Sequence, residues 1–222
     1  TVHTENALRS LRRRSYILEL LMEHYLDELQ AGCGVSRANL IYSGGGHCYV
    51  LLPNTAAVAD TLTRWNRQFN RWLQQQFGAQ LFLANAWTPC SGNDLTNTPA
   101  EKSPYKALFR RVNRLLEQHK FHRNTAEDLR QLNDTAAYPD GRECKVGGTS
   151  ANLKDDLCPW CRLFVDLSYK IQNKTAFVVS RRASDADDCT LPALDGGSDY
   201  LYLTDPATAR KRLRSAERIV RV

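Results

Sequence analysis

Three of the seven cysteines are spaced so that their thiolates could share one metal ion. Cys158 and Cys161 form a Cys-x-x-Cys pair, and Cys144 precedes this pair in the same part of the chain. Thiolates with this spacing are common structural zinc ligands, and structural zinc sites are almost always four-coordinate. We therefore predict a zinc site at these three thiols. Water or a distant histidine, such as His119 or His122, would supply the fourth ligand.

The same Cys-x-x-Cys pair permits a second interpretation, a thiol–disulfide redox centre. Cys158 stands before a helix that we predict from Arg162 onward, and a helix N-terminus lowers the pKa of a thiol. The residues from Lys154 to Leu157 are mostly charged, whereas a thioredoxin-like motif belongs next to strands and helices of a βαβ pattern. Both interpretations stay open, and either a bound zinc ion or a reducible disulfide would decide between them.

A glycine-rich turn is the second feature that could do chemistry. It consists of Ser43, Gly44, Gly45 and Gly46, followed by His47. Glycine lets a phosphate approach the backbone closely and exposes N–H groups to it. Two-metal nucleotidyl transfer also requires carboxylates that hold the ions, and this turn has none. The turn can therefore contact a phosphate without holding catalytic metals. The alternative is a plain tight turn that binds nothing.

The elements that position the turn follow from hydrophobic periodicity. Leu18, Met22, Tyr25 and Leu29 recur at spacings of three and four residues, which is typical of the inner face of a helix. Apolar runs flank the glycines and predict the two strands of a hairpin. The predicted elements are helix 6–30, strands 39–42 and 47–52, helix 55–78 and strand 80–85. This order predicts an α+β fold, a sheet with helices on one face.

The second half of the chain predicts further helices and strands. They are a helix from Pro104, a helix over 163–171, strands over 175–180 and 200–203, and a helix from Pro206. The acidic segment from Asp195 to Asp199 resembles a catalytic tip, but Pro192 makes the residues before it a poor central strand, so we predict a solvated turn. His24 has no carboxylate or serine partner at motif spacing, so a hydrolase triad is not supported.

Composition restricts the class of protein. Thirty lysines and arginines against 24 acidic residues give a net charge of +6, which is weak support for nucleic-acid binding. The densest basic runs are 12–14 and 210–212, and both a solvated face and a phosphate contact are open for them. The chain has no apolar run of about 18 residues, and its odd cysteine count argues against a secreted disulfide framework. We therefore expect a cytoplasmic protein with no membrane partner.

Three segments resemble a known family. They are Ala7 to Tyr16, Leu40 to Gly46, and Tyr49 to Thr55. In this order they resemble the first palm of the large subunit of type III-A CRISPR effector (Csm) complexes. The Cys-x-x-Cys lies where that family has such a motif, and residues 216–222 look like the run-in to its second palm. The resemblance covers essentially the whole chain, and the first residue is not Met, so we expect a piece of a longer protein.

The resemblance implies a ferredoxin-like palm of the nucleotide cyclase and polymerase type, whose first strand lies before Thr1. The regions that it implies are a first palm over 1–100, a helical segment over 101–140, a Cys-rich zinc module over 141–172, and strands with a basic helix over 173–222. The family has a second Cys-x-x-Cys where this sequence has Cys144 and Gly147. The resemblance therefore implies a zinc site that has lost its fourth thiolate.

For function, the resemblance implies a complete protein that makes cyclic oligoadenylates from ATP and cleaves single-stranded DNA when target RNA binds, in antiviral defence. Ser43 to Gly46 would contact an ATP shared with the second palm. The Gly-Gly-Asp-Asp and HD motifs of the family are not in this sequence, so we expect no catalytic residue and no activity of this piece alone. The implied partners are the other Csm subunits, crRNA and target RNA. The alternative is a structural or RNA-scaffolding module with no nucleotide site.

Overall fold

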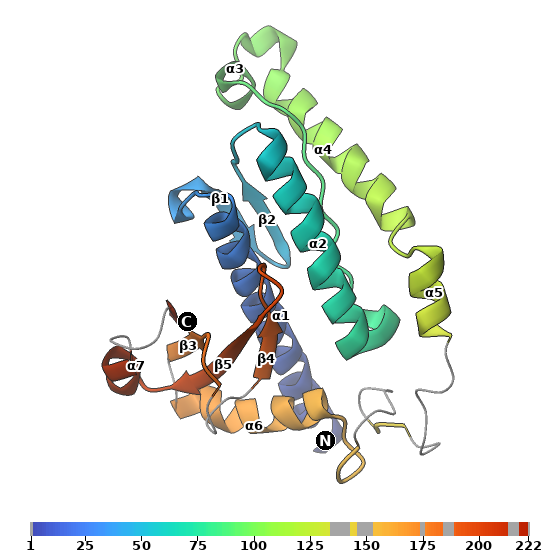
Figure 1. Cartoon of the computed structure of the whole chain (residues 1–222), viewed down its shortest axis with the longest axis vertical. Coiled ribbons are helices and arrows are strands. Elements are labelled where there is room, and N and C mark those ends of the chain that lie inside the picture. Colours follow the sequence, from blue (N-terminus) through green and yellow to red (C-terminus); the bar gives the residue numbers. More distant parts are fainter. Residues whose placement is uncertain are drawn as a thin grey trace. The chain divides into compact units, whose positions relative to one another are not determined.

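The computed structural model describes residues 2–133, 143–145, 153–173, 176–183, 189–212 and 218–221. The chain forms two compact units. The first unit comprises Thr1–Pro53 and Ala136–Val222, and the second comprises Asn54–Thr135. Helices and strands are mixed along the chain, so the predicted α+β class is confirmed (Figure 1). In the part of the chain that is described, no helix is both long enough and apolar enough to span a membrane.

The first unit begins with a long helix, α1 (Val2–Gly32), which confirms the predicted helix. The predicted inner face was wrong at Leu18, whose side chain is 42% exposed. The buried face of α1 includes His24 and Glu28, two polar residues that a count of apolar spacings ignores, so it is rotated away from Leu18. Among the side chains of α1 that the structure describes, the buried apolar residues are Ile17, Leu20, Leu21, Tyr25, Leu26 and Leu29.

A two-stranded hairpin follows α1 and carries the glycine turn. β1 (Leu40–Gly44) and β2 (His47–Val50) pair antiparallel, as predicted, after a short 3-10 turn at Arg37–Asn39. Gly45 and Gly46 form the two-residue loop, with φ values of 58° and 76°. Positive φ at both central residues is the geometry of a type I′ turn, which glycine adopts without a steric penalty. The local sequence therefore determines both the position and the shape of this turn.

A four-stranded antiparallel sheet occupies the C-terminal part of the first unit, with the strand order β4-β5-β3-β6. Its strands are β3 (Ala176–Ser180), β4 (Cys189–Pro192), β5 (Ser198–Thr204) and β6 (Arg218–Arg221). β4 lies at the edge of the sheet, where a proline is tolerated. Helix α6 (Pro159–Asn173) packs against α1 and β5, and α7 (Pro206–Arg212) packs against β3. The core between α7 and the sheet comprises Ala176, Val178, Tyr202 and Ala209.

The second unit consists of helices and connecting segments. Its helices are α2 (Ala56–Phe77), α3 (Gly92–Leu95), α4 (Pro104–Phe121) and α5 (Ala126–Leu132), with 3-10 turns at Gly78–Gln80 and Ala100–Lys102. Thr55 caps α2 by accepting a hydrogen bond from the N–H of Val58 at 3.3 Å. The buried stripe of α2 comprises Val58, Leu62, Trp65, Phe69, Leu73 and Phe77. These spacings confirm the predicted helix.

The strand predicted over residues 80–85 was wrong. Residues 81–90 form no strand. The N–H of Leu83 donates to Oδ1 of Asn70 at 2.8 Å, and Nδ2 of Asn70 donates back to the carbonyl of Leu83 at 2.9 Å. A side chain of α2 thus satisfies the backbone groups that a neighbouring strand would otherwise bind. The apolar segment around Leu83 therefore binds to α2 and does not join a sheet.

Candidate functional site

The glycine turn between β1 and β2 offers bare backbone at an open tip. Ser43, Gly45 and Gly46 are exposed, and Gly44 is half-buried. A Cβ built on Gly45 or Gly46 would meet no atom within 4 Å, so a ligand can approach both residues. The four predicted nucleotide-binding residues therefore lie together at one tip. Consecutive backbone N–H groups in such a turn are suited to a phosphate.

The root of the hairpin is attached to α1 by an ion-pair cluster. Arg37, just before β1, pairs with both Glu23 and Asp27 of α1, and its Nη2 lies 2.9 Å from Oδ1 of Asp27. The carboxylates of Glu23 and Asp27 therefore bind Arg37 and hold the start of the hairpin on α1. Burial, followed by the charge of Glu23, raises the pKa of Cys48 on β2 to about 11. Cys48 thus stays a protonated thiol at neutral pH and is unsuited to nucleophilic chemistry.

The three predicted zinc ligands come together in space. Cys144, Cys158 and Cys161 are all buried, and their sulfur atoms lie within 4.8 Å of one another. Cys158 directly precedes α6 and Cys161 lies in its first turn. The N–H of Lys145 donates to the carbonyl of Asp156 at 3.1 Å, which holds the segment of Cys144 against the loop before Cys158. The N–H of Arg162 donates to the carbonyl of Cys158 at 3.0 Å, which attaches Cys158 to the first turn of α6.

The geometry of this thiol cluster bears on the two interpretations of the Cys-x-x-Cys pair. Burial raises the pKa of Cys161, and hydrogen bonds with Cys158 and Cys144 raise it further. The attacking thiolate of a redox pair would belong to Cys158, the first cysteine of the motif, so the raised pKa of Cys161 does not distinguish the two interpretations. Three converging sulfur atoms are a donor set that zinc accepts, because the ion itself stabilises the thiolates. The chemistry of the cluster favours metal binding.

The fourth zinc ligand is not provided by the described residues. Among them, the group of possible metal ligands consists of the three cysteines alone. Gly147, where the resemblance implied a lost cysteine, lies outside the described residues. His119 and His122 are exposed residues of the second unit, and Nδ1 of His122 lies 3.0 Å from the carbonyl oxygen of Gln118.

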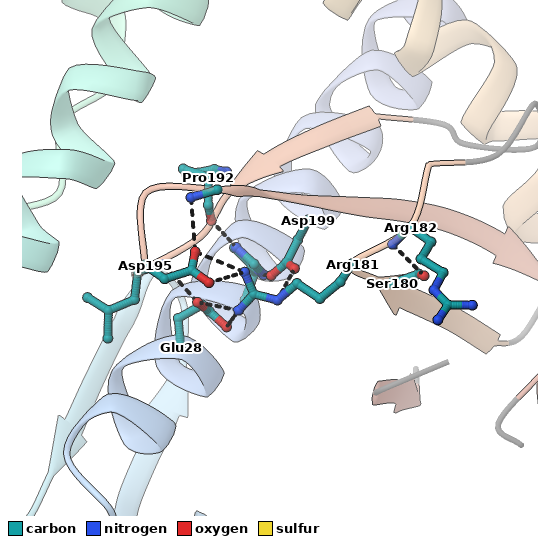
Figure 2. A network of polar contacts seen from close by, with 10 residues as sticks. Glu28, Ser180, Arg181, Arg182, Pro192, Asp195 and Asp199 are labelled. Atoms are coloured by element: carbon teal, nitrogen blue, oxygen red, sulfur yellow. Dashed lines mark hydrogen bonds and ion pairs between the residues drawn. The ribbon is translucent and has the colours of Figure 1, made fainter. Parts of the chain in front are cut away.

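A network of charged side chains joins α1 to the β4–β5 hairpin, and no motif in the sequence indicated it. Figure 2 shows Arg181, which follows β3, among three carboxylates. Its Nε lies 3.0 Å from Oδ1 of Asp199, its Nη1 lies 3.2 Å from Oδ1 of Asp195, and its Nη2 lies 3.3 Å from Oε2 of Glu28. Glu28 also accepts the N–H of Leu194 at 2.8 Å. These contacts attach the β4–β5 hairpin to α1.

His24 belongs to the same network. Its Nε2 lies 2.7 Å from the carbonyl of Pro192 and acts as the donor there, and its Nδ1 lies 3.8 Å from Oδ2 of Asp199. The predicted solvated turn was therefore wrong at Asp199, which lies in β5 and is 1% exposed, although Asp195 is exposed. In the sequence, the available sign of this network was two polar residues one turn apart among the apolar positions of α1, His24 and Glu28.

Most side chains of the two predicted basic runs lie outside the described residues. Of residues 12–14, only the side chain of Arg14 is described, and it is exposed on α1. Residues 210–212 lie in α7, but their side chains are outside the described residues. Solvation and phosphate contact therefore both stay predictions for these runs.

Comparisons with known proteins agree on one family. The family model described as Csm1 subunit domain B matches residues 1–135. A protein of Mycobacterium tuberculosis, described as CRISPR system single-strand-specific deoxyribonuclease Cas10/Csm1 (subtype III-A), is 38% identical over 189 residues, which cover 79% of this chain and 23% of that protein. A protein of Enterococcus italicus with the same description is 35% identical over 176 residues, covering 78% of this chain and 23% of its own.

Solved structures show the same fold. A Csm1–Csm4 cassette in complex with one ATP matches 90% of this chain and 23% of its own chain, with a TM-score of 0.65 and 20% identity. A Csm1–Csm4 cassette in complex with cA4 has a TM-score of 0.59 and 19% identity, covering 90% of this chain and 22% of its own. This chain thus spans about a quarter of the length of the proteins that it matches. Because the family model covers residues 1–135 of the 222, the chain belongs to the Csm1 subunit domain B family.

Proposed function

We propose that this chain is part of the large subunit of a type III-A CRISPR effector (Csm) complex. The complete subunit makes cyclic oligoadenylates from ATP and cleaves single-stranded DNA when target RNA binds. Membership of the Csm1 subunit domain B family supports this proposal, as do relatives described as single-strand-specific deoxyribonucleases. Similar structures that contain ATP, AMPPNP or cA4 support the nucleotide chemistry. The proposed partners are the other Csm subunits, crRNA and target RNA.

Within that protein, this chain contributes a non-catalytic palm of the ferredoxin-like, cyclase and polymerase type over residues 1–100. Residues 101–140 follow as a helical segment, 141–172 as a Cys-rich zinc module, and 173–222 as the approach to the second palm. The observation that carries the assignment is the hairpin tip: it is open, built of glycines in a left-handed conformation, and free of carboxylates. Ser43 to Gly46 bind the phosphates of ATP, while the second palm holds the metals.

Replacement of Gly45 by valine in the full-length protein tests this role. Gly45 has φ of 58° and faces open space, so the side chain would occupy the volume where a phosphate approaches. Gly34→Val is the matched control, because Gly34 also has positive φ, 67°, and open space, but lies beyond the end of α1. We expect Gly45→Val to reduce oligoadenylate synthesis at least about tenfold, the loss that corresponds to about 1.4 kcal/mol of binding.

The control decides how that result is interpreted. If Gly34→Val lowers synthesis as much as Gly45→Val, backbone strain explains the loss and the tip has no nucleotide role. If neither variant lowers synthesis, the hairpin is a structural element, and the alternative of an RNA-scaffolding module without a nucleotide site is favoured. ATP titrated into the 222-residue chain should bind weakly in either case, because the other half of the proposed pocket belongs to the second palm.

The thiol cluster is proposed to hold a structural zinc ion. With Zn–S distances of about 2.3 Å in a tetrahedral site, two ligand sulfur atoms lie about 3.8 Å apart. The sulfur atoms of Cys144, Cys158 and Cys161 are all within 4.8 Å of one another, which fits that geometry. Bound zinc would connect the segment around Cys144 to the start of α6. Redox chemistry is not favoured, because three sulfur atoms converge where a disulfide pair needs only two.

A further inference from the structure

Helix α4 carries a row of cations on its exposed side. Lys106, Arg110 and Arg114 follow one another at intervals of four residues, and all three side chains are exposed. At a rise of 1.5 Å per residue, successive cations lie about 6 Å apart along the helix axis. Side chains four residues apart share one face of a helix. The three cations therefore form an evenly spaced row along one side of the helix, turning by about 40° at each step.

An exposed aromatic ring lies at the end of this row. The side chain of Phe121, in the last turn of α4, is 84% exposed, the largest value among the exposed large apolar residues of the described part of the chain. Phe121 lies seven residues after Arg114, which is about two helical turns, so it is on the same face as the cations. Lys120 and Arg123, both exposed, are near Phe121 in the sequence. A ligand with a flat, apolar surface and negative charges would complement both the exposed ring and the nearby cations.

The charge of this face is not neutralised by its own helix. Residues 104–123 contain six lysines and arginines and one acidic residue, Glu117. Among the described residues, no ion pair involves Lys106, Arg110 or Arg114, whereas Arg37, Arg130 and Arg181 are all paired. The cations are thus available to an external anion.

We infer that the basic face of α4, defined as Lys106, Arg110, Arg114, Lys120 and Phe121, binds single-stranded nucleic acid. The phosphates follow the row of cations, and an unpaired base stacks on Phe121. Nonspecific single-strand binding combines these two elements, a basic track and an aromatic platform. A duplex would satisfy the cations but would keep its bases stacked internally, away from the ring. The inference rests on the proposed function, since it names a surface through which that protein contacts RNA or single-stranded DNA.

The test measures binding of fluorescent oligonucleotides to the 222-residue chain by anisotropy. The probes are an oligo-U of about 15 nucleotides, a length within the range that single-strand binding sites cover, and an RNA duplex of equal length. Phe121→Ala should weaken oligo-U binding about tenfold, since base–aromatic stacking contributes that much, and leave duplex binding unchanged. Leu129→Ala, at another exposed apolar residue of the second unit, is the control and should have no effect.

The contribution of the cations is measured by the salt dependence. The triple variant K106A/R110A/R114A should reduce the slope of log K against log salt for oligo-U by about 2, since each phosphate contact in a single strand contributes about 0.7. The triple variant R64A/R67A/R71A removes three exposed arginines of α2 and is the charge-matched control. Its slope should change by less than half as much.

Three outcomes would overturn the inference. If both triple variants weaken binding equally, net charge accounts for the binding. If Phe121→Ala binds oligo-U as tightly as the unmodified chain does, the ring is not a stacking platform. If Phe121→Ala weakens binding of poly-glutamate as much as that of oligo-U, the face is a site for an acidic protein. None of these results changes the expected loss of oligoadenylate synthesis in the Gly45→Val protein, which tests the proposed function. A failure of the nucleic-acid inference can therefore be distinguished from a failure of the proposed function.

Discussion

Replacing Arg181 with methionine leaves Glu28 and Asp199 without the guanidinium that both contact. Their side chains are 4% and 1% exposed, so two negative charges stay where water has little access. Removing one partner of a buried ion pair typically costs about 3–5 kcal/mol. Arg181 is itself 32% exposed, and water can replace part of it, so we expect the lower end, about 3 kcal/mol of unfolding free energy.

Urea unfolding of the 222-residue chain, followed by circular dichroism, measures this loss. Arg182→Met is the control, because Arg182 is an exposed neighbour of the same charge whose side chain points away from the network in Figure 2. Its free energy of unfolding should change by no more than about 0.5 kcal/mol. In a thermal scan, Arg181→Met should lower Tm by about 6–12 °C, at roughly 2–4 °C per kcal/mol for a chain of this size.

The pH dependence gives a second readout. In the Arg181→Met chain, protonation of Glu28 or Asp199 removes the buried charge, so the folded state takes up protons more readily than the unfolded state. Stability of the variant relative to the unmodified chain should therefore rise as the pH falls from neutrality toward about 5. Equal stabilities of the two arginine variants, or a deficit that widens in acid, would refute the reasoning.

Two further predictions concern local contacts. Asn70→Ala should lower the free energy of unfolding by about 1–3 kcal/mol, because both backbone groups of Leu83 lose their partners. Faster hydrogen exchange of the Leu83 amide measures this effect. Asn113→Ala, on the exposed side of α4, is the control and should not change that exchange rate. Purified protein should contain about one zinc ion per chain, released by acid because protons compete for the thiolates, and Cys158→Ser should lose it whereas Cys90→Ser, at an exposed cysteine, should retain it. Protein free of zinc with an oxidised 158–161 disulfide would instead favour the redox interpretation.

The features that the sequence predicted well are those that neighbouring residues determine. The glycine turn is one example, since two residues with positive φ specify the hairpin. The start of α2 is another, because Thr55 caps the helix through Val58. Segments resembling the Csm large subunit were also sufficient to identify the family, which the family model confirms.

The predictions that failed depend on partners far away in the sequence. Leu83 was expected in a strand, but its backbone binds a side chain of α2. His24 has its carboxylate partner on β5, a distance along the chain that no motif spans. Of the candidate sites, the thiol cluster could be predicted because two of its cysteines share one motif, whereas the convergence of Cys144 with them depends on the tertiary fold.

The first unit is discontinuous in the sequence, and this has a consequence for its synthesis. α1 leaves the ribosome before the second unit, but Arg181 and Asp199, which contact the polar groups on its buried face, are made after the whole second unit. At about 5–20 residues per second, the delay between Glu28 and Asp199 is roughly 9–34 s. The second unit is contiguous and can fold during that interval. The newly made α1 therefore spends many seconds before Arg181 can pair with Glu28, and during that time its apolar face and the Glu28 carboxylate are exposed to water.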